Sequence, residues 1–583
     1  MIFTFNPSII CHGVALELNK LFTPLLVKTA PWLLGIIITA LAIFNDGYSV
    51  ITVDMMHAIE LSKAMLNDKE LYKDLFEVNH PMMMYIAWIP VYIASHLSWL
   101  HEVLATTLFI CVLCLISIIL SYKIMILTDE YKDPYFRFTH IITLFYVTFL
   151  LPMHYTNSAE LGQKSHLFFI LFLPYLHSFL LHNHQRKRHP ILMLFTGISA
   201  GIGLCVKIYF FVVIAILEIG MLMKKKQPIK DMWKAIFRIE SLSVALIAIL
   251  FLLSILCFTP EYITNIIPIA KFGYLGYASE TRFYWLNFLL KLSPQFLFLF
   301  IFISIKPKFP NYHALIKLAI LASLISLIPQ ASKWNHTALP TLGIIMLLVA
   351  AVIADIIGKI RNDFKKNHKT LSQKNISEIL WILVTLLFLA YSVSINISNY
   401  KTIRQTLYHK NNIHRFIELS KEYGDKGGAH FLIPSYIPSL YTWIYGDFSL
   451  QNYFFSTYMI DGIREYKTKQ HYKNASPHIK EEIELAEIKI RDLMILDIEQ
   501  QKPALIIIHS GFLEPGLSIS NEKPATLIKN QHIKPTNVDY ISFLNENKTF
   551  TKVWRHYHLK EKIISRDPEK NFPIFSIYIR KDL

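Results

Sequence analysis

Acidic side chains are concentrated in residues 45–102 of an otherwise basic chain. This segment carries eight carboxylates and three lysines, whereas the whole sequence has a formal net charge of +16. A carboxylate held in a site can remove a proton from a hydroxyl or amine, although most outward-facing carboxylates are simply solvated. Asp54 is the strongest candidate because it lies one turn from His57 on the polar side of an expected interfacial helix over 54–66. The eight are Asp46, Asp54, Glu60, Asp68, Glu70, Asp74, Glu77 and Glu102.

Basic residues lie in other expected outer loops. A leaving group that gains negative charge in a reaction is stabilised by positive charge already held beside it. Lys207 lies in a turn between two apolar stretches, where Gly201 and Gly203 would allow close backbone approach. A snorkelling lysine is the ordinary alternative. The anion-binding candidates in these loops are Lys164, Lys207, Lys271, Arg282, Lys333 and His336.

A second acid, Glu160, lies in the expected outer loop 154–167, close to Lys164. It could act near an acceptor, or it could cap a helix together with Ser158. A divalent metal site is a further alternative, built from Asp54, His57, Glu160 and His166. Because the chain has 24 histidines, chance clusters are expected, and the sequence leaves a metal open.

The composition identifies the elements that must position these residues. Hydrophobic residues make up 53% of the 583 positions and charged residues only 17%, which excludes an ordinary soluble enzyme and a disordered chain. We expect a polytopic α-helical membrane protein with about eleven spans. They are expected near 28–44, 103–122, 138–153, 167–181, 191–206, 208–222, 241–258, 286–304, 314–329, 341–358 and 376–396.

Basic residues set the predicted topology. With the N-terminus cytoplasmic and 81–100 not crossing, the Lys and Arg clusters fall inside, as membrane proteins prefer. The apolar segment 81–100, which contains Pro90, is then a juxtamembrane helix, and the tail lies outside. This charge distribution explains the net positive charge without nucleic acid as a partner. The five cysteines all precede the tail, which favours a bacterial inner membrane with a periplasmic tail.

The predicted organisation is a transmembrane domain over 1–396, including the first outer loop 45–102, followed by an extracytoplasmic α/β domain over 397–583. The tail mixes helical patterns at 411–423 and 479–501 with short β-rich runs. These runs are 429–434, 504–509 and 574–580.

The segment 54–90 resembles the first outer loop of the GT-C membrane glycosyltransferases, which include protein O-mannosyltransferases and lipid A aminoarabinose transferase. The chain departs from that family in having Val53 and Met55 on either side of its first acid, and His80 where the aminoarabinose transferase pattern has lysine. The matching positions are Asp54, Asn67, Tyr72, Asp74, Phe76, Glu77 and Pro81.

The resemblance implies a GT-C-like fold and inverting transfer of a sugar from a polyprenyl-phosphate donor to a glycan, lipid or protein acceptor at the outer membrane face. Asp54 would be the general base and Glu160 a second acid. The donor phosphate and sugar would contact His57, His80, Lys164, Lys207, Lys271, Arg282, Lys333 and His336. Membrane lipids are expected partners, and no cofactor is certain. Alternatives are a transporter or flippase of a lipid-linked saccharide and a non-catalytic envelope assembly protein.

Overall fold

The computed structural model describes residues 51–154, 160–184, 189–224, 237–277, 307–330, 335–367, 413–423, 426–433, 457–468, 470–509, 539–563 and 575–583, with seven positions between 29 and 40. The expected spans 286–304 and 376–396 lie outside these ranges, as do Arg282, Lys333 and the predicted boundary at 396–397.

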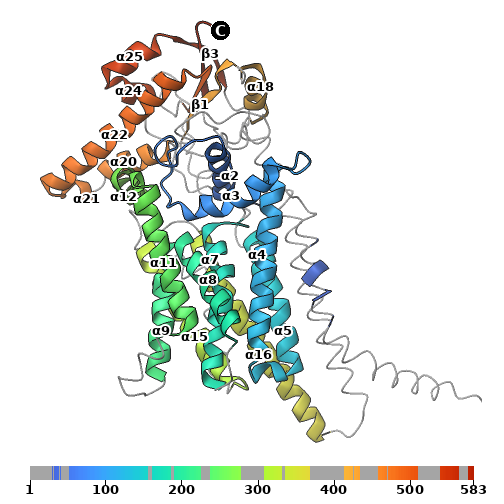
Figure 1. Cartoon of the computed structure of the whole chain (residues 1–583). Coiled ribbons are helices and arrows are strands. Elements are labelled where there is room, and N and C mark those ends of the chain that lie inside the picture. The colour runs from blue at the N-terminus through green and yellow to red at the C-terminus, as the bar shows by residue number, and fades with distance from the viewer. Residues whose placement is uncertain are drawn as a thin grey trace, which may run out of the picture.

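Apolar helices run side by side and form the main body of the molecule (Figure 1). They are α4 (Glu102–Met125), α5 (Pro134–Phe145), α7 (Lys164–Ser178), α8 (Pro190–Val206), α9 (Phe211–Lys224), α11 (Ile239–Phe258), α15 (Pro310–Gln330) and α16 (Leu339–Asn367). Within the described residues, five stretches are long and apolar enough to cross a membrane. These stretches are Glu102–Met125, Lys164–Leu181, Ile239–Phe258, Pro310–Leu327 and His336–Ile356.

Short irregular helical turns extend several of these helices. α5 begins at Pro134, where the Asp133 side chain accepts hydrogen bonds from the N–H groups of Tyr135 and Phe136 at 2.9 Å each. A π-helical turn, η2, then continues it into α6. The turns and the short helix are η1 (Glu130–Lys132), η2 (Tyr146–Leu150), α6 (Leu151–His154), η3 (Phe179–His184), η4 (Ile208–Phe210) and η6 (Asn335–Ala338).

Helix α7 is central, and α11 lies at the periphery. Every residue of α7 from Ser165 to Ser178 is buried, and α7 packs against α8, α4 and α16. In contrast, α11 exposes large apolar side chains such as Leu246, Leu253 and Phe258. Exposed side chains of this kind suit contact with lipid rather than water. The first residue of α7 is therefore anchored by the best-buried helix of the described bundle.

Two short helices, α2 (Val53–Leu66) and α3 (Met82–Ser95), lie at one end of the upright helices (Figure 1). α3 contains Pro90 and lies across that end. α2 differs from the expected interfacial helix, because residues all around it are buried, including Met55, Ile59 and Ser62. Packing against α3 covers it, so α2 is a fixed element of the protein interior.

The tail contains a four-stranded sheet at the same end of the molecule as α2 and α3 (Figure 1). Its strand order is β1-β2-β4-β3, with β1 and β2 parallel and the other pairs antiparallel. The strands are β1 (Ala429–Leu432), β2 (Leu505–His509), β3 (Tyr557–Ile563) and β4 (Phe575–Arg580). Three coincide with the β-rich runs of the sequence. Strand β3 was not predicted, because its polar composition, YHLKEKI, hides the strand pattern.

Helices of the tail pack around this sheet and against the bundle. One contact with the bundle is made by α12 (Ile267–Tyr277), which follows the π-helical turn η5 (Tyr262–Ile266) and crosses α20 closely. A Cβ on Gly276 would lie 1.7 Å from the carbonyl oxygen of Gly462, so the crossing needs glycine. The tail helices are α18 (Ile413–Tyr423), α20 (Tyr458–Thr468), α21 (Gln470–Lys473), α22 (Pro477–Gln501), α24 (Tyr540–Asn545) and α25 (Lys548–Trp554).

Candidate active site

A backbone bridge joins the two loops that carry the candidate acids. Ile51 and Leu161 form an isolated β-bridge, in which the N–H of Thr52 donates to the carbonyl oxygen of Leu161 at 3.1 Å. Gly162 follows with φ +80°, and a Cβ there would lie 2.6 Å from Cδ1 of Ile110. Only glycine adopts that conformation in that space without strain. The start of α2 and the loop before α7 are therefore held side by side.

Asp54 receives its partners from the start of α7. Nζ of Lys164 lies 3.3 Å from Oδ2 of Asp54, and the Gln163 amide donates to the same oxygen at 3.4 Å. Gln163 is itself fixed as the N-cap of α7, because its side-chain oxygen accepts the N–H of Ser165 at 2.5 Å. The Asp54 side chain keeps 36% of its surface exposed, whereas Lys164 keeps 13%.

The charge on Asp54 is stabilised by its neighbours. Burial alone would raise the pKa of this carboxyl, but the Lys164 ammonium and the His336 ring outweigh that effect and hold the pKa below its usual value. Asp54 is therefore ionised near neutral pH. An ionised and partly exposed carboxylate can accept a proton from a group that reaches it.

Glu77, which was not among the predicted site residues, is the buried centre of the arrangement. Its carboxylate, 1% exposed, lies 2.9 Å from Nδ1 of His57 and accepts the backbone N–H of Asn79 at 2.6 Å. The Asn79 side-chain amide donates to the same carboxylate. Burial tends to raise the pKa of Glu77, but His57 and Lys164 offset this and leave the pKa below its usual value. Its place in the family-like motif was the available signal.

Asn79 connects this centre to Asp54. Its side-chain oxygen accepts a hydrogen bond from Nζ of Lys164 at 2.5 Å, while its amide faces Glu77. The backbone carbonyl of Asn79 accepts the Tyr72 hydroxyl. A continuous polar chain thus runs from His57 through Glu77, Asn79 and Lys164 to Asp54.

Lys207 brings a second cation to the same region. Its Nζ donates to Oγ of Ser165, next to Lys164, at 2.9 Å. Burial lowers the pKa of Lys207 to about 7, with a further contribution from Lys164, while Asp54 and Glu160 oppose the shift. The mutual influence of these groups shows that both lysines and both acids share one electrostatic environment.

Glu160 lies beside His336. Oε2 of Glu160 lies 3.8 Å from Nδ1 of His336, and the backbone N–H of Glu160 donates to the carbonyl oxygen of Pro152 at 3.0 Å. His336 belongs to η6, immediately before α16. This contact brings the late loop of the chain to the cluster.

Histidines of the predicted site have other roles than the sequence indicated. Burial, with a smaller contribution from Lys164, lowers the pKa of His80 to about 4, so His80 is neutral at neutral pH and brings no positive charge. His57 is committed to Glu77. His166 accepts the N–H of Gly162 at 3.1 Å through Nδ1 and contacts the carbonyl oxygen of Thr148 at 2.8 Å through Nε2.

The metal alternative does not fit these contacts. Both ring nitrogens of His166 are occupied, and Nδ1 of His57 faces Glu77. Across the described ranges, no three histidine, cysteine or acidic side chains are grouped so that they could hold a metal ion. The proposed set of Asp54, His57, Glu160 and His166 is therefore wrong as a ligand set.

Lys271 and the glycines before Lys207 also differ from expectation. Nζ of Lys271 lies 3.1 Å from Oε2 of Glu482 in α22, and the lysine is 53% exposed. This ion pair joins the bundle to the tail. Gly201 and Gly203 serve helix packing: a Cβ on Gly201 would lie 2.8 Å from Ile247 and one on Gly203 3.0 Å from Leu171.

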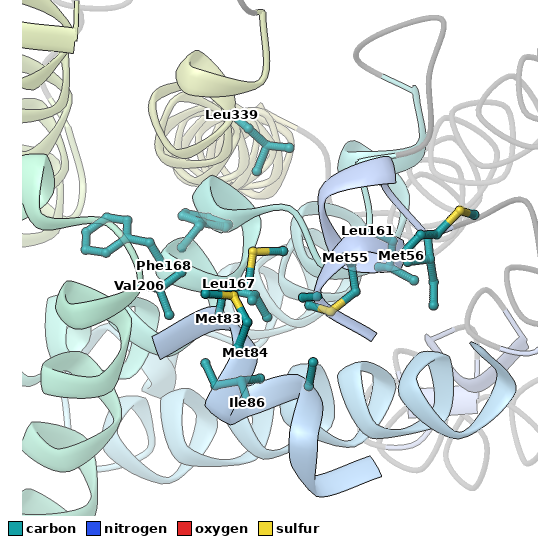
Figure 2. Close-up of a cluster of buried hydrophobic side chains, with 14 of the residues drawn as sticks. Met55, Met56, Met83, Met84, Ile86, Leu161, Leu167, Phe168, Val206 and Leu339 are labelled. Atoms are coloured by element: carbon teal, nitrogen blue, oxygen red, sulfur yellow. The ribbon is translucent and has the colours of Figure 1, made fainter. Parts of the chain in front are cut away.

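A cluster of buried apolar side chains includes the sequence neighbours of the polar site residues (Figure 2). Met55 and Met56 follow Asp54 on α2, Leu161 follows Glu160, and Val206 precedes Lys207. Each polar side chain is thus the immediate sequence neighbour of a residue that is almost fully buried. The other labelled members are Met83, Met84, Ile86, Leu167, Phe168 and Leu339. Burial of such side chains contributes about 1.5–3 kcal/mol each, enough to hold the loops in register.

Comparisons with solved structures show a structural likeness. No family model and no curated protein sequence matches the chain. Among solved structures, the crystal structure of ArnT from Cupriavidus metallidurans bound to undecaprenyl phosphate is similar, with 10% identical residues and a TM-score of 0.46. The match covers 94% of this chain and 98% of that chain.

Proposed function

We propose that this protein is a membrane glycosyltransferase that moves a sugar from a polyprenyl-phosphate donor to an acceptor at the outer face of a bacterial inner membrane. The observation that carries the proposal is the convergence of an ionised, partly exposed carboxylate, Asp54, with the cations Lys164 and Lys207. They come from three separate parts of the chain: α2, the start of α7 and the turn between α8 and η4. The resemblance of residues 54–90 to the GT-C first outer loop gives the same reaction class.

In the proposed reaction, an acceptor hydroxyl or amine attacks the anomeric carbon of the donor sugar from the face opposite the phosphate. The bond between the anomeric carbon and the phosphate oxygen breaks, and its electron pair stays on the polyprenyl phosphate. Asp54 takes the proton of the attacking group. Because one displacement occurs, the configuration at the anomeric carbon inverts.

Lys164 and Lys207 would receive the departing phosphate. Its negative charge grows as the bond breaks, so preorganised ammonium groups favour the transition state over the ground state. His336 and Glu160 border the same cluster and would contact the sugar or the acceptor. His80, being neutral, would donate a hydrogen bond without adding charge. Lys333 and Arg282 lie outside the described residues, so their proposed phosphate contacts remain expectations from the sequence.

The test is a transfer assay with the full-length protein in nanodiscs, using a panel of radiolabelled polyprenyl-phosphate sugars and a membrane extract as acceptor. Wild-type protein should transfer label from at least one donor, and Asp54→Asn should reduce the rate by a factor of at least about 10³. Glu70→Gln is the matched control, because Glu70 is an exposed acid of the same loop that pairs with Lys73. Full activity in Asp54→Asn would contradict the role of Asp54.

A transporter of lipid-linked saccharides is the alternative from another functional class. Proteoliposomes that move the labelled lipid between leaflets, with no sugar transfer from any donor, would favour it. Dependence of translocation on Asp54 would then assign the cluster to substrate passage rather than to chemistry.

A further inference from the structure

We propose that Lys164 is shared between Asp54 and the donor phosphate, so that donor binding draws the ammonium off Asp54 and frees this carboxylate to act as the base. The inference rests on the proposed function and adds an order to it: donor first, acceptor deprotonation second. Asp54 is then a base that the donor itself switches on.

The contacts of Lys164 carry this inference. Its Nζ donates to Oδ1 of Asn79 at 2.5 Å and lies 3.3 Å from Oδ2 of Asp54. An ammonium has three N–H donors. The shorter contact is to the neutral amide oxygen, and the longer one is to the carboxylate. Asn79 therefore tethers Lys164, and the Asp54 contact is the one that a stronger anion can replace.

The tether is itself rigid. Asn79 is held by Glu77, which accepts both its backbone N–H and its side-chain amide. Glu77 is almost completely buried and also pairs with His57. At the other end, Lys164 is the first residue of the buried helix α7, so its backbone is fixed. Only the flexible lysine side chain has to move for the ammonium to change partners.

Lys207 supplies the reason for the ammonium to move. It is bonded to Ser165, the residue after Lys164, and the two lysines repel each other strongly enough to affect Lys207. A phosphate that binds both ammonium groups replaces this repulsion with attraction. While Lys164 faces Asp54, in contrast, it stabilises the ionised carboxylate and makes it a weaker base. Donor binding therefore relieves the repulsion between the two lysines and also makes Asp54 a stronger base.

The experiment is a double-mutant cycle on binding of undecaprenyl phosphate to the full-length protein in nanodiscs of zwitterionic lipid. Asp54→Asn removes the competitor for Lys164, so it should tighten binding by about fivefold, whereas Lys164→Met should weaken it. In the Lys164→Met background, Asp54→Asn should change the affinity by less than about twofold. If the loss of Asp54 tightens phosphate binding only when Lys164 is present, Asp54 and the phosphate share Lys164.

Two controls separate this coupling from a general charge effect. Removal of any nearby negative charge attracts a phosphate, but that effect would persist undiminished in the Lys164→Met background. In the Lys207→Met background the Asp54→Asn effect should remain at least about threefold, because Lys207 bonds Ser165 and not Asp54. Glu70→Gln, an exposed acid of the same loop, should leave the affinity unchanged.

The outcomes distinguish this inference from the proposed function. Equal effects of Asp54→Asn in both Lys164 backgrounds, or no tightening at all, would overturn the sharing of Lys164 while sugar transfer by the wild type stood. A wild-type protein that does not bind undecaprenyl phosphate would overturn the polyprenyl-phosphate donor and the sharing with it. Neither result depends on the acceptor being known.

Discussion

Nδ1 of His57 lies 2.9 Å from Oε2 of Glu77, with both side chains almost fully shielded from solvent. This contact ties α2 to the loop before α3, and the same carboxylate holds Asn79, the partner of Lys164. One buried acid thus sets the position of groups on both sides of Asp54. This arrangement and its surroundings lead to five predictions.

Glu77→Gln should lower both stability and transfer. The amide cannot accept all the hydrogen bonds that the buried carboxylate accepts, and it leaves His57 without an anionic partner. We expect a loss of about 2 kcal/mol in the free energy of unfolding and about tenfold in transfer rate. Thermal unfolding in detergent and the nanodisc assay measure these changes, with Glu70→Gln as control. An unchanged unfolding temperature would contradict the central role of Glu77.

Glu77 should also make the folded protein sensitive to acid. Its pKa in the folded protein lies below the usual 4.5, so the unfolded chain binds the proton more readily. The stability that Glu77 contributes is therefore full above about pH 4.5 and is lost as the pH falls through the folded pKa. The free energy of unfolding, measured between about pH 6 and about pH 3, should fall less steeply toward low pH in Glu77→Gln than in the wild type. The same slope in both proteins would contradict this role of Glu77.

Loss of the proton from Lys207 should weaken donor binding as the pH rises. Because its pKa is about 7, its positive charge is present below that pH and is lost above it. Affinity for undecaprenyl phosphate should therefore fall as the pH rises through about 7. Lys207→Arg keeps its charge over this range, so the affinity of this variant should not fall there. The phosphate itself titrates in the same way with both proteins. A fall in affinity that persists in Lys207→Arg would therefore contradict the role given to Lys207.

Gly162→Ala should displace the loop that carries Glu160, Gln163 and Lys164. Alanine meets both an unfavourable φ of +80° and a contact of 2.6 Å with Ile110. We expect destabilisation by about 1–3 kcal/mol together with a loss of transfer. Adding Ile110→Val relieves the contact but not the backbone strain, so it should restore only part of the stability. Complete restoration by the valine would mean that φ costs little there.

Lys271→Met should leave sugar transfer unchanged, because Lys271 pairs with Glu482 at the contact between α12 and α22. Both side chains are largely exposed, so the pair contributes less than about 1 kcal/mol. Glu482→Gln should behave in the same way in the transfer assay. A large loss of transfer in Lys271→Met but not in Glu482→Gln would instead indicate that Lys271 contacts the donor.

The sequence by itself was sufficient for the apolar helices that the structure describes, for a helix within 81–100, and for three of the four strands of the described sheet. Long apolar runs must form helices that satisfy their own backbone, and alternating apolar runs favour strands, whatever the rest of the chain does. Asp54, Lys164 and Lys207 were also recognisable, because charges beside such runs are expensive to place without a role.

The partners of these charges were decided only by tertiary structure. Whether Lys164 faces Asp54 or Glu160 depends on the backbone bridge between Ile51 and Leu161, a contact between residues far apart in the chain. Glu77 was marked only by its place in the family-like motif and Asn79 by nothing, until the packing of α2 and α3 buried Glu77 and partly buried Asn79. Lys271 resembled a site lysine until the tail supplied Glu482. Residue types and local periodicity fix which groups are available, but electrostatic energy depends on distance and burial, and both are set by packing.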